Sequence, residues 1–223
     1  MTAGADPTID GLRFVVTAGG TREPIDPVRF IGNRSSGKMG NALAAAAIRR
    51  GATVTLVTAA APPAAHPGLT VVPVETADEM HAAVRAALAG ARVLIMAAAV
   101  ADWRPRQVAR HKLKKGSETL TLELVPTIDI LGALRDDDAA TGVFVVGFAA
   151  ETERVIDNAR AKLEAKHLDL VVVNDVSQEG IGMGADENEV TVIGRDGTLE
   201  TVARAPKTII ADAILRIIAS RLR

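Results

Sequence analysis

The 223-residue sequence contains no cysteine and few aromatic side chains, with four phenylalanines and one tryptophan. The absence of cysteine excludes disulfides, thiolate-ligated zinc and a cysteine nucleophile, and it favours a reducing, cytoplasmic setting. The scarcity of aromatic side chains disfavours a single-stranded nucleic-acid binder, because such proteins stack bases on aromatic rings. Hydrophobic residues make up 48% of the chain and are mostly alanine and valine, which suits helices packed on a sheet.

A long apolar segment and a strong net charge are also missing. No run reaches the roughly 18 apolar residues of a membrane span, and the start, "MTAGADPTID", lacks the pattern of a signal peptide. Residues 1–10 are small, polar and proline-bearing, so we expect a linker, as in one half of a longer polypeptide. The four histidines are scattered and predict no metal site. With a net charge of −1, an anionic ligand must be met by local clusters of cations.

Apolar runs alternate with helical patterns, which predicts one α/β domain over residues 11–223. The expected architecture is a Rossmann-like, doubly wound and mainly parallel sheet, with ligands at the carboxyl ends of the strands. Strands are expected at 12–18, 53–59, 92–100, 119–124, 142–151 and 168–176, and helices at 37–50, 76–89, 127–135 and 152–167. A late β-hairpin excursion at about 187–202, around "GRDG", and a closing helix over 205–222 complete the chain.

The stretch "GNRSSGKMG" (32–40) looks like a P-loop but lacks two of its features. Met39 stands where a P-loop has serine or threonine, and about fifteen residues separate the glycines from the preceding strand. The dinucleotide fingerprint G-x-G-x-x-G is also missing after that strand. Ser35, Ser36 and Gly37 open a helix whose free N–H groups favour phosphate, which predicts a more general anion site. The alternative is ordinary helix capping by serine.

The stretch "AAAVADWRP" (97–105) follows an apolar strand. Ala98 and Ala99 offer unobstructed backbone groups at the strand end, and Asp102 offers a carboxylate to a hydroxyl, an amide or a metal-bound water. These features indicate close approach of a ligand. Packing of the alanines under a helix, with Asp102 turning the chain, is the alternative.

The run "RHKLKK" (110–115) places five cationic side chains in six residues. Such runs are usually solvated surface. Beside a phosphate-binding helix end, the same run is typical of a flap that neutralises a triphosphate and the departing pyrophosphate. We therefore predict a flap over about 104–117.

The segment from "GFAAE" to "VVVNDV" (147–176) carries the last group of candidates. Phe148 lies on a strand at the edge of the sheet where ligands are expected. Lys162 and Lys166 lie four residues apart on one helical face, where both could reach an anion. Asn174 ends the last parallel strand, where an amide can bind a base edge. Surface lysines and an ordinary Asx turn remain the alternatives.

Taken together, these stretches resemble bacterial phosphopantothenoylcysteine synthetase. The resemblance covers about residues 11–222 and rests on strings that occur there in the same order: "GGTREPIDPVRFIGNRSSGKMG", "AAAVADWRP" followed by "KLKK", "GFAAET" and "NDVS". In many bacteria this synthetase is the C-terminal half of a multifunctional enzyme whose N-terminal half is a flavin-dependent decarboxylase. The resemblance thus implies a ligase of coenzyme A biosynthesis, with such a decarboxylase half as a possible fusion partner.

The reaction implied by the resemblance is carboxylate activation by nucleotidyl transfer. The carboxylate of 4′-phosphopantothenate attacks the α-phosphorus of CTP, assisted by Mg²⁺, to give an acyl-cytidylate and pyrophosphate. The amine of L-cysteine then displaces CMP. This chemistry needs positioning and charge stabilisation but no protein nucleophile, which agrees with the lack of cysteine.

The resemblance also implies roles for single residues. Asn33 corresponds to a side chain that holds the carbonyl region of the acyl intermediate, and Lys112 to the flap lysine on the phosphates. Ala98, Ala99 and Asp102 correspond to substrate contacts, and Ala98 and Asp102 also to nucleotide contacts. The expected nucleotide site further contains Ser35, Ser36, Gly37, Gly40, Lys112, Ile128, Asp129, Ile130, Leu131, Phe148, Lys162 and Lys166, with Asn174 added from its position alone.

The family is dimeric, so a homodimer is expected, with the late hairpin and the flap crossing to the other subunit. The sequence assigns no metal ligand, and neither nucleic acid nor a membrane is an expected partner. Two other classes stay open from the fold: an NAD(P)-binding oxidoreductase and a nucleotide-binding protein without catalysis.

Overall fold

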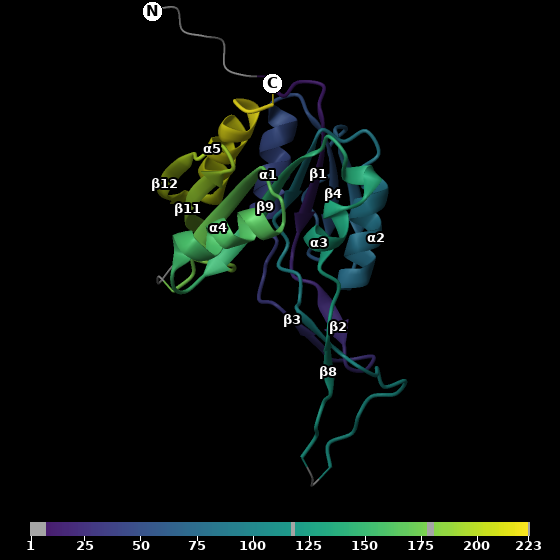
Figure 1. Ribbon diagram of the computed structural model, residues 1–223. Coiled ribbons are helices and arrows are strands. Elements are labelled where there is room, and N and C mark those ends of the chain that lie inside the picture. Colours follow the sequence, from purple (N-terminus) through teal and green to yellow (C-terminus); the bar gives the residue numbers. More distant parts are fainter. Residues whose placement is uncertain (1–7, 117–118, 178–180, 223) are drawn as a thin grey trace, which may run out of the picture.

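The computed structural model describes residues 8–116, 119–177 and 181–222. Its centre is one eight-stranded sheet with the order β12-β11-β10-β9-β6-β1-β4-β5 (Figure 1). Its strands are β1 (Arg13–Ala18), β4 (Thr53–Thr58), β5 (Leu69–Pro73), β6 (Val93–Met96), β9 (Phe144–Glu151), β10 (Leu170–Asp175), β11 (Glu187–Gly194) and β12 (Leu199–Pro206). The strands from β5 to β10 in this order are parallel, which confirms the predicted sheet.

The order of the parallel strands reverses between β1 and β6. From β1 the chain crosses outward to β4 and β5, and from β6 it continues in the opposite direction to β9 and β10. Connections on the two sides diverge at such a switch point and leave a crevice outside the carboxyl ends of the strands. The fold therefore places any ligand site beside the ends of β1 and β6.

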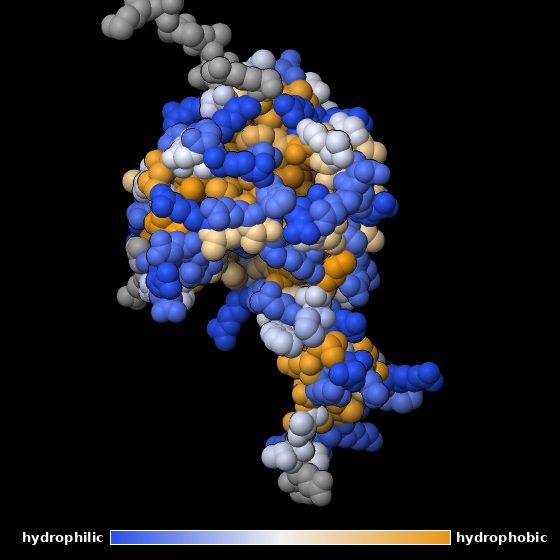
Figure 2. Space-filling view, viewed as in Figure 1, coloured by the Kyte–Doolittle hydropathy of each residue, from blue (hydrophilic) through white to orange (hydrophobic). Residues whose placement is uncertain are grey.

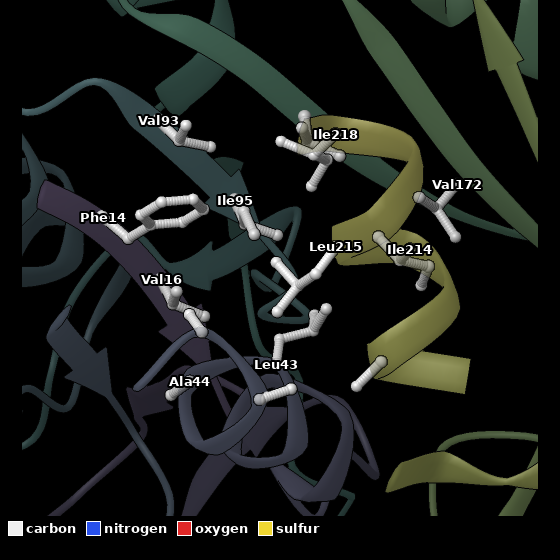
Figure 3. Close-up of a cluster of buried hydrophobic side chains, with 14 of the residues drawn as sticks. Phe14, Val16, Leu43, Ala44, Val93, Ile95, Val172, Ile214, Leu215 and Ile218 are labelled. Carbon is white, nitrogen blue, oxygen red and sulfur yellow. The ribbon is translucent and has the colours of Figure 1, made fainter. Parts of the chain in front are cut away.

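Helices cover both faces of the sheet because each central strand is apolar on both sides. Along β1, Phe14 and Val16 point into one core cluster and Val15 into another, as the alternation of a strand requires. Helices α1 (Lys38–Arg49) and α5 (Lys207–Ala219) pack together over the first face (Figure 3). The second face carries α2 (Ala77–Ala87), α3 (Ile130–Arg135) and α4 (Val155–Ala165).

The predicted late hairpin is present, formed by β11 and β12. It continues the main sheet instead of leaving it, because β11 pairs antiparallel with β10. Strand β12 also runs to Pro206, past the predicted end at residue 202. The proposed linker over 1–10 lies mostly outside the described residues.

An arm extends from the body of the molecule (Figure 1). It consists of two short antiparallel pairs, β2 (Arg22–Pro24) with β3 (Phe30–Gly32) and β7 (Trp103–Pro105) with β8 (Leu124–Pro126). The predicted flap begins within β7 and runs toward β8, and its residue 117 falls outside the described residues. The sequence pattern did not reveal this arm.

The prediction of a sheet strand over 119–124 was wrong. Only Leu124 belongs to a strand, and it pairs with β7 in the arm. Leu120, Leu122 and Leu124 alternate with polar residues as in a half-buried strand, yet their side chains are exposed, Leu120 by 61%. The sequence analysis also missed β5, the edge strand that pairs with β4.

In the described part of the chain, no helix has the length and apolar character needed to cross a lipid bilayer.

Candidate active site

A cleft of about 690 Å³ opens at the switch point of the sheet. Its lining comes from the N-terminus of α1, the segment after β6, the start of α3, strand β9, helix α4 and the end of β10, together with Gly182, Met183, Asn188 and Lys207. Its size is that of a small-molecule site. The cleft brings together groups that are more than one hundred residues apart in the sequence.

The N-terminus of α1 supplies backbone donors to one wall of the cleft. The helix begins at Lys38, and its N-cap, Gly37, has a left-handed backbone with φ of 77° and no side-chain capping bond. Serine capping, the alternative reading of "RSSG", is thus not what the structure shows. Gly37, Lys38, Met39 and Gly40 all line the cleft, so the free N–H groups of the first turn remain available to an anion.

Two glycines let this helix start so close to the sheet. A Cβ on Gly37 would lie 2.7 Å from the Cβ of Ala60, and one on Gly40 would lie 2.6 Å from both the Cβ of Ala18 and the carbonyl of Thr17. Neither position has room for a side chain. The glycines of the stretch therefore set the helix against β1 and leave its end uncovered.

Buried threonines fix the segment after β6. The hydroxyl of Thr17 accepts a hydrogen bond from the Ala98 N–H at 3.0 Å, and that of Thr21 accepts one from the Ala101 N–H at 2.8 Å. The Ala99 N–H donates to the Gly19 carbonyl at 2.8 Å. This segment therefore forms a rigid backbone wall that carries Asp102 at the cleft.

Asn33 joins this wall to the start of α1. Its side-chain amide donates to the carbonyls of Ala99 at 3.3 Å and Val100 at 3.0 Å. The side-chain oxygen of Asn33 is not needed for either bond, and the residue lines the cleft. Asn33 thus holds one wall and presents an acceptor at the same place.

Helix α4 and its C-cap residue supply two ammonium groups on the opposite side. Lys162 donates to the Phe148 carbonyl at 2.6 Å, and Lys166 pairs with Asp129. Burial lowers the pKa of Lys162, partly offset by Glu151. Burial alone would raise the pKa of Asp129, but its hydrogen bond with Lys166 brings that pKa below its ordinary value.

A loop over 181–186 closes the cleft beside α1. Lys207, only 6% exposed, donates from its ammonium to the carbonyls of Gly182, at 2.9 Å, and Ala185. Lys38 pairs with Asp186 at 2.6 Å, and Ser36 donates to the Met183 carbonyl at 2.9 Å. Burial lowers the pKa of Lys207, and repulsion from the Lys38 ammonium lowers it further. Three side chains thus hold this loop against the N-terminal end of α1.

Nearly every candidate residue from the sequence reaches this cleft. The exceptions are Ser36, which faces the 181–186 loop, and Lys112, which is exposed on the arm. The candidates that line the cleft are Asn33, Ser35, Gly37, Gly40, Ala98, Ala99, Asp102, Ile128, Asp129, Ile130, Leu131, Phe148, Lys162, Lys166 and Asn174. Their roles toward ligands stay predictions.

Sequence reasoning missed Lys207, Gly182, Met183 and Asn188, which also line the cleft. A signal existed for Lys207, because it lies on the apolar stripe of the closing helix with Ile210 and Ile214, where a lysine is unexpected. No comparable pattern marked the other three. Across the described ranges, no group of three or more His, Asp or Glu side chains is placed to hold a metal.

Comparison with known proteins identifies relatives along nearly the whole chain. The family described as the DNA/pantothenate metabolism flavoprotein C-terminal domain matches residues 9–222. The coenzyme A biosynthesis bifunctional protein CoaBC of Bacillus subtilis is 44% identical over 95% of this chain and 52% of its own length. That of Escherichia coli K12 is 47% identical over 83% of this chain and 46% of its own length. The chain therefore spans about half the length of these curated relatives.

Solved structures agree with this relationship. The C-terminal domain of a CoaBC protein is 38% identical, with a TM-score of 0.79 and coverage of 98% of both chains. Cab2 in complex with phosphopantothenate-cysteine is 18% identical, with a TM-score of 0.76 over 95% of this chain and 86% of Cab2. At that identity, the second likeness shows the fold alone.

The loop contacts of Lys207 predict the result of a substitution. Lys207→Met keeps the apolar stem but removes the donor to two backbone carbonyls, so we expect the free energy of unfolding to fall by about 1–3 kcal/mol. Hydrogen exchange in 181–186 should also become faster. Denaturant titration and exchange mass spectrometry measure both effects, with Lys115→Met, on the exposed flap, as the matched control. Unchanged unfolding and exchange in Lys207→Met would contradict the assigned contacts.

Proposed function

The chain belongs to the family of the DNA/pantothenate metabolism flavoprotein C-terminal domain, and we propose that it is a CTP-dependent phosphopantothenate–cysteine ligase. In this proposal the chain joins 4′-phosphopantothenate and L-cysteine, a step of coenzyme A biosynthesis. The bifunctional CoaBC relatives support the pathway, and their greater length supports a decarboxylase half as the fusion partner in the full-length protein.

The observation that carries the proposal is the pairing of two anion-binding elements across one cleft. The uncapped N-terminus of α1 offers backbone N–H groups on one wall, and Lys162 and Lys166 offer ammonium groups on the other. A nucleoside triphosphate needs donors along its whole chain of phosphates. The net charge of the protein is near zero, so this local arrangement, not a global field, supplies the attraction.

In the proposed first step, the carboxylate of 4′-phosphopantothenate attacks the α-phosphorus of CTP, and the bond to the β-phosphate oxygen breaks. Pyrophosphate leaves and an acyl-cytidylate remains. Ser35, Gly37 and the first turn of α1 cradle the phosphates, and Lys162 and Lys166 stabilise the charge that develops on them. The segment 128–131 and Phe148 form the nucleotide pocket, with Asn174 as a further contact.

In the second step, the amine of L-cysteine attacks the acyl carbon, and CMP leaves with the carboxylate oxygen that formed the bond to phosphorus. A proton is released from the amine. Asn33 holds the acyl region against the rigid wall of Ala98 and Ala99. The chain needs no nucleophile of its own, because both displacements are driven by position and charge.

Mg²⁺ fits this site as the companion of the triphosphate. One carboxylate, Asp102, lines the cleft without a side-chain hydrogen bond to any described residue, whereas Asp129 is paired with Lys166. A single carboxylate suits Mg²⁺, which is held mainly by substrate phosphates and water. Bound there, the ion would neutralise charge on the phosphates.

We also propose that the protein is a homodimer assembled through its arm. Seven large apolar side chains on the arm are exposed: Val28, Phe30, Trp103, Val108, Leu120, Leu122 and Leu124. Figure 2 shows apolar residues gathered on the arm below the body of the molecule. An apolar surface concentrated on one projecting element is typical of an interface. A second copy, bringing the same surface, would cover it by symmetric pairing.

The proposed reaction predicts a specific nucleotide requirement. Purified protein with Mg²⁺ and 4′-phosphopantothenate should release pyrophosphate with CTP but not with ATP, and sustained turnover should require L-cysteine. A coupled pyrophosphate assay measures both. Equal release with ATP would contradict the nucleotide preference. Binding of CTP without any release would identify a nucleotide-binding protein without catalysis.

Asn33→Asp should separate nucleotide binding from acyl transfer. The aspartate cannot donate to the Ala99 and Val100 carbonyls and places a negative charge beside them, so the acyl group loses its support. We expect CTP affinity by calorimetry to stay within about threefold and amide formation to slow by about tenfold or more. Amide formation at the unaltered rate would show that Asn33 does not hold the acyl group.

The dimer proposal predicts a twofold mass by light scattering. Phe30→Asp with Leu120→Asp should give monomers, because charges would enter the buried apolar interface. Ile209→Asp introduces the same change at an exposed position of α5, away from the arm, and should leave the dimer intact. A monomeric wild-type protein with full activity would refute the proposal.

A further inference from the structure

The turn between β2 and β3 contains a buried carboxylate that the proposed reaction does not use. Asp26, within the string "EPIDPVRF", has a fully buried side chain. One of its oxygens accepts hydrogen bonds from the Val28 and Arg29 N–H groups at 2.8 and 2.9 Å. The other oxygen pairs with the Arg29 guanidinium. Within the turn alone, Asp26 is already well satisfied.

Asp26 and Arg29 also reach across to the flap. The second Asp26 oxygen accepts the Leu113 N–H at 3.0 Å, and the Arg29 guanidinium donates to the Leu113 carbonyl at 2.6 Å. A third bond runs from the Ala109 N–H to the Ile25 carbonyl at 2.9 Å. Both backbone groups of one flap residue are therefore held by an ion pair from a segment about 84 positions away in the sequence.

The residue held in this way directly follows Lys112. We propose that Asp26 and Arg29 are positioning residues that fix the flap through Leu113 and thereby set where the Lys112 ammonium can act. The inference rests on the proposed function, and it takes for Lys112 the role that the family resemblance implies, a flap lysine that acts on the phosphates. Lys112 itself is exposed, so the backbone beside it is the part of the flap that is anchored.

We call the Asp26–Arg29 ion pair and its bonds to Leu113 the clamp. Electrostatics keep it formed at physiological pH. The hydrogen bond with Arg29 holds the pKa of Asp26 well below its ordinary value, against the opposing effect of burial. A carboxyl with a depressed folded-state pKa contributes its full stability above the unfolded value of about 3.9 and loses it as pH falls toward the folded value. Asp26 is therefore ionised, and the clamp formed, throughout the neutral range.

The test combines kinetics with hydrogen exchange. Lys112→Gln should lower kcat for pyrophosphate release by about 100-fold, because charge stabilisation is lost. Asp26→Asn should lower kcat by about 10- to 100-fold, because misplacement of a catalytic group by about 1 Å has a cost of that size. The double variant should be no slower than Lys112→Gln within about threefold, and exchange in 109–116 should rise in Asp26→Asn.

Glu123→Gln is the matched control, because it removes a carboxylate from an exposed arm ion pair with Arg106, whereas the hydrogen bonds of Leu113 in the described part of the chain go to Asp26 and Arg29. Its kcat and flap exchange should equal those of the wild type. Arg29→Met, at a partly exposed site, gives the same test if Asp26→Asn does not fold.

The clamp proposal is wrong if the kcat losses of Asp26→Asn and Lys112→Gln multiply in the double variant. It is also wrong if hydrogen exchange in the flap is unchanged in Asp26→Asn. If the wild type releases no pyrophosphate, the proposed function fails, and exchange in 109–116 alone then decides whether the clamp exists.

Discussion

The close approach of α1 to β1 is the constraint on which the cleft depends. Gly40 lies so near Ala18 and Thr17 that no side chain fits between helix and strand. Gly37, the N-cap before the helix, has a left-handed backbone and no side-chain capping bond. The free N–H groups of the first turn therefore line the switch point of the sheet, where a doubly wound fold leaves a crevice.

Other elements form the remaining walls of the cleft. Backbone bonds and buried threonines make the segment after β6 rigid, so Ala98 and Ala99 form a fixed wall. Lys162 and Lys166 place positive charge on the other side, and Lys207 secures the loop that closes one end. A protein with almost no net charge can thus concentrate cations where a polyanion would lie.

The sequence predicted the parallel sheet well, because buried parallel strands are continuous apolar runs with helices between them. The prediction failed for two segments that do not follow this pattern. The partly exposed strand β5 ends in Pro73 and gave no clear run, whereas 119–124 alternates like a strand but lies exposed on the arm. Some candidate site residues, such as Asn33 and residues 128–131, came from the family resemblance, and others, such as Ala98 and Asn174, were found because they lie at strand ends. Lys207 and the Asp26 clamp were not, since their partners are distant backbone carbonyl and N–H groups that no local pattern reveals.

The central claim is that a carboxylate is activated by forming a bond to the α-phosphorus of CTP in this cleft. The most direct measurement follows one oxygen atom through the reaction. 4′-Phosphopantothenate labelled with ¹⁸O in its carboxylate is turned over with CTP, Mg²⁺ and L-cysteine, and the nucleotide product is analysed by mass spectrometry. The account predicts CMP that carries one ¹⁸O atom. Unlabelled CMP, or label in inorganic phosphate together with CDP, would contradict it.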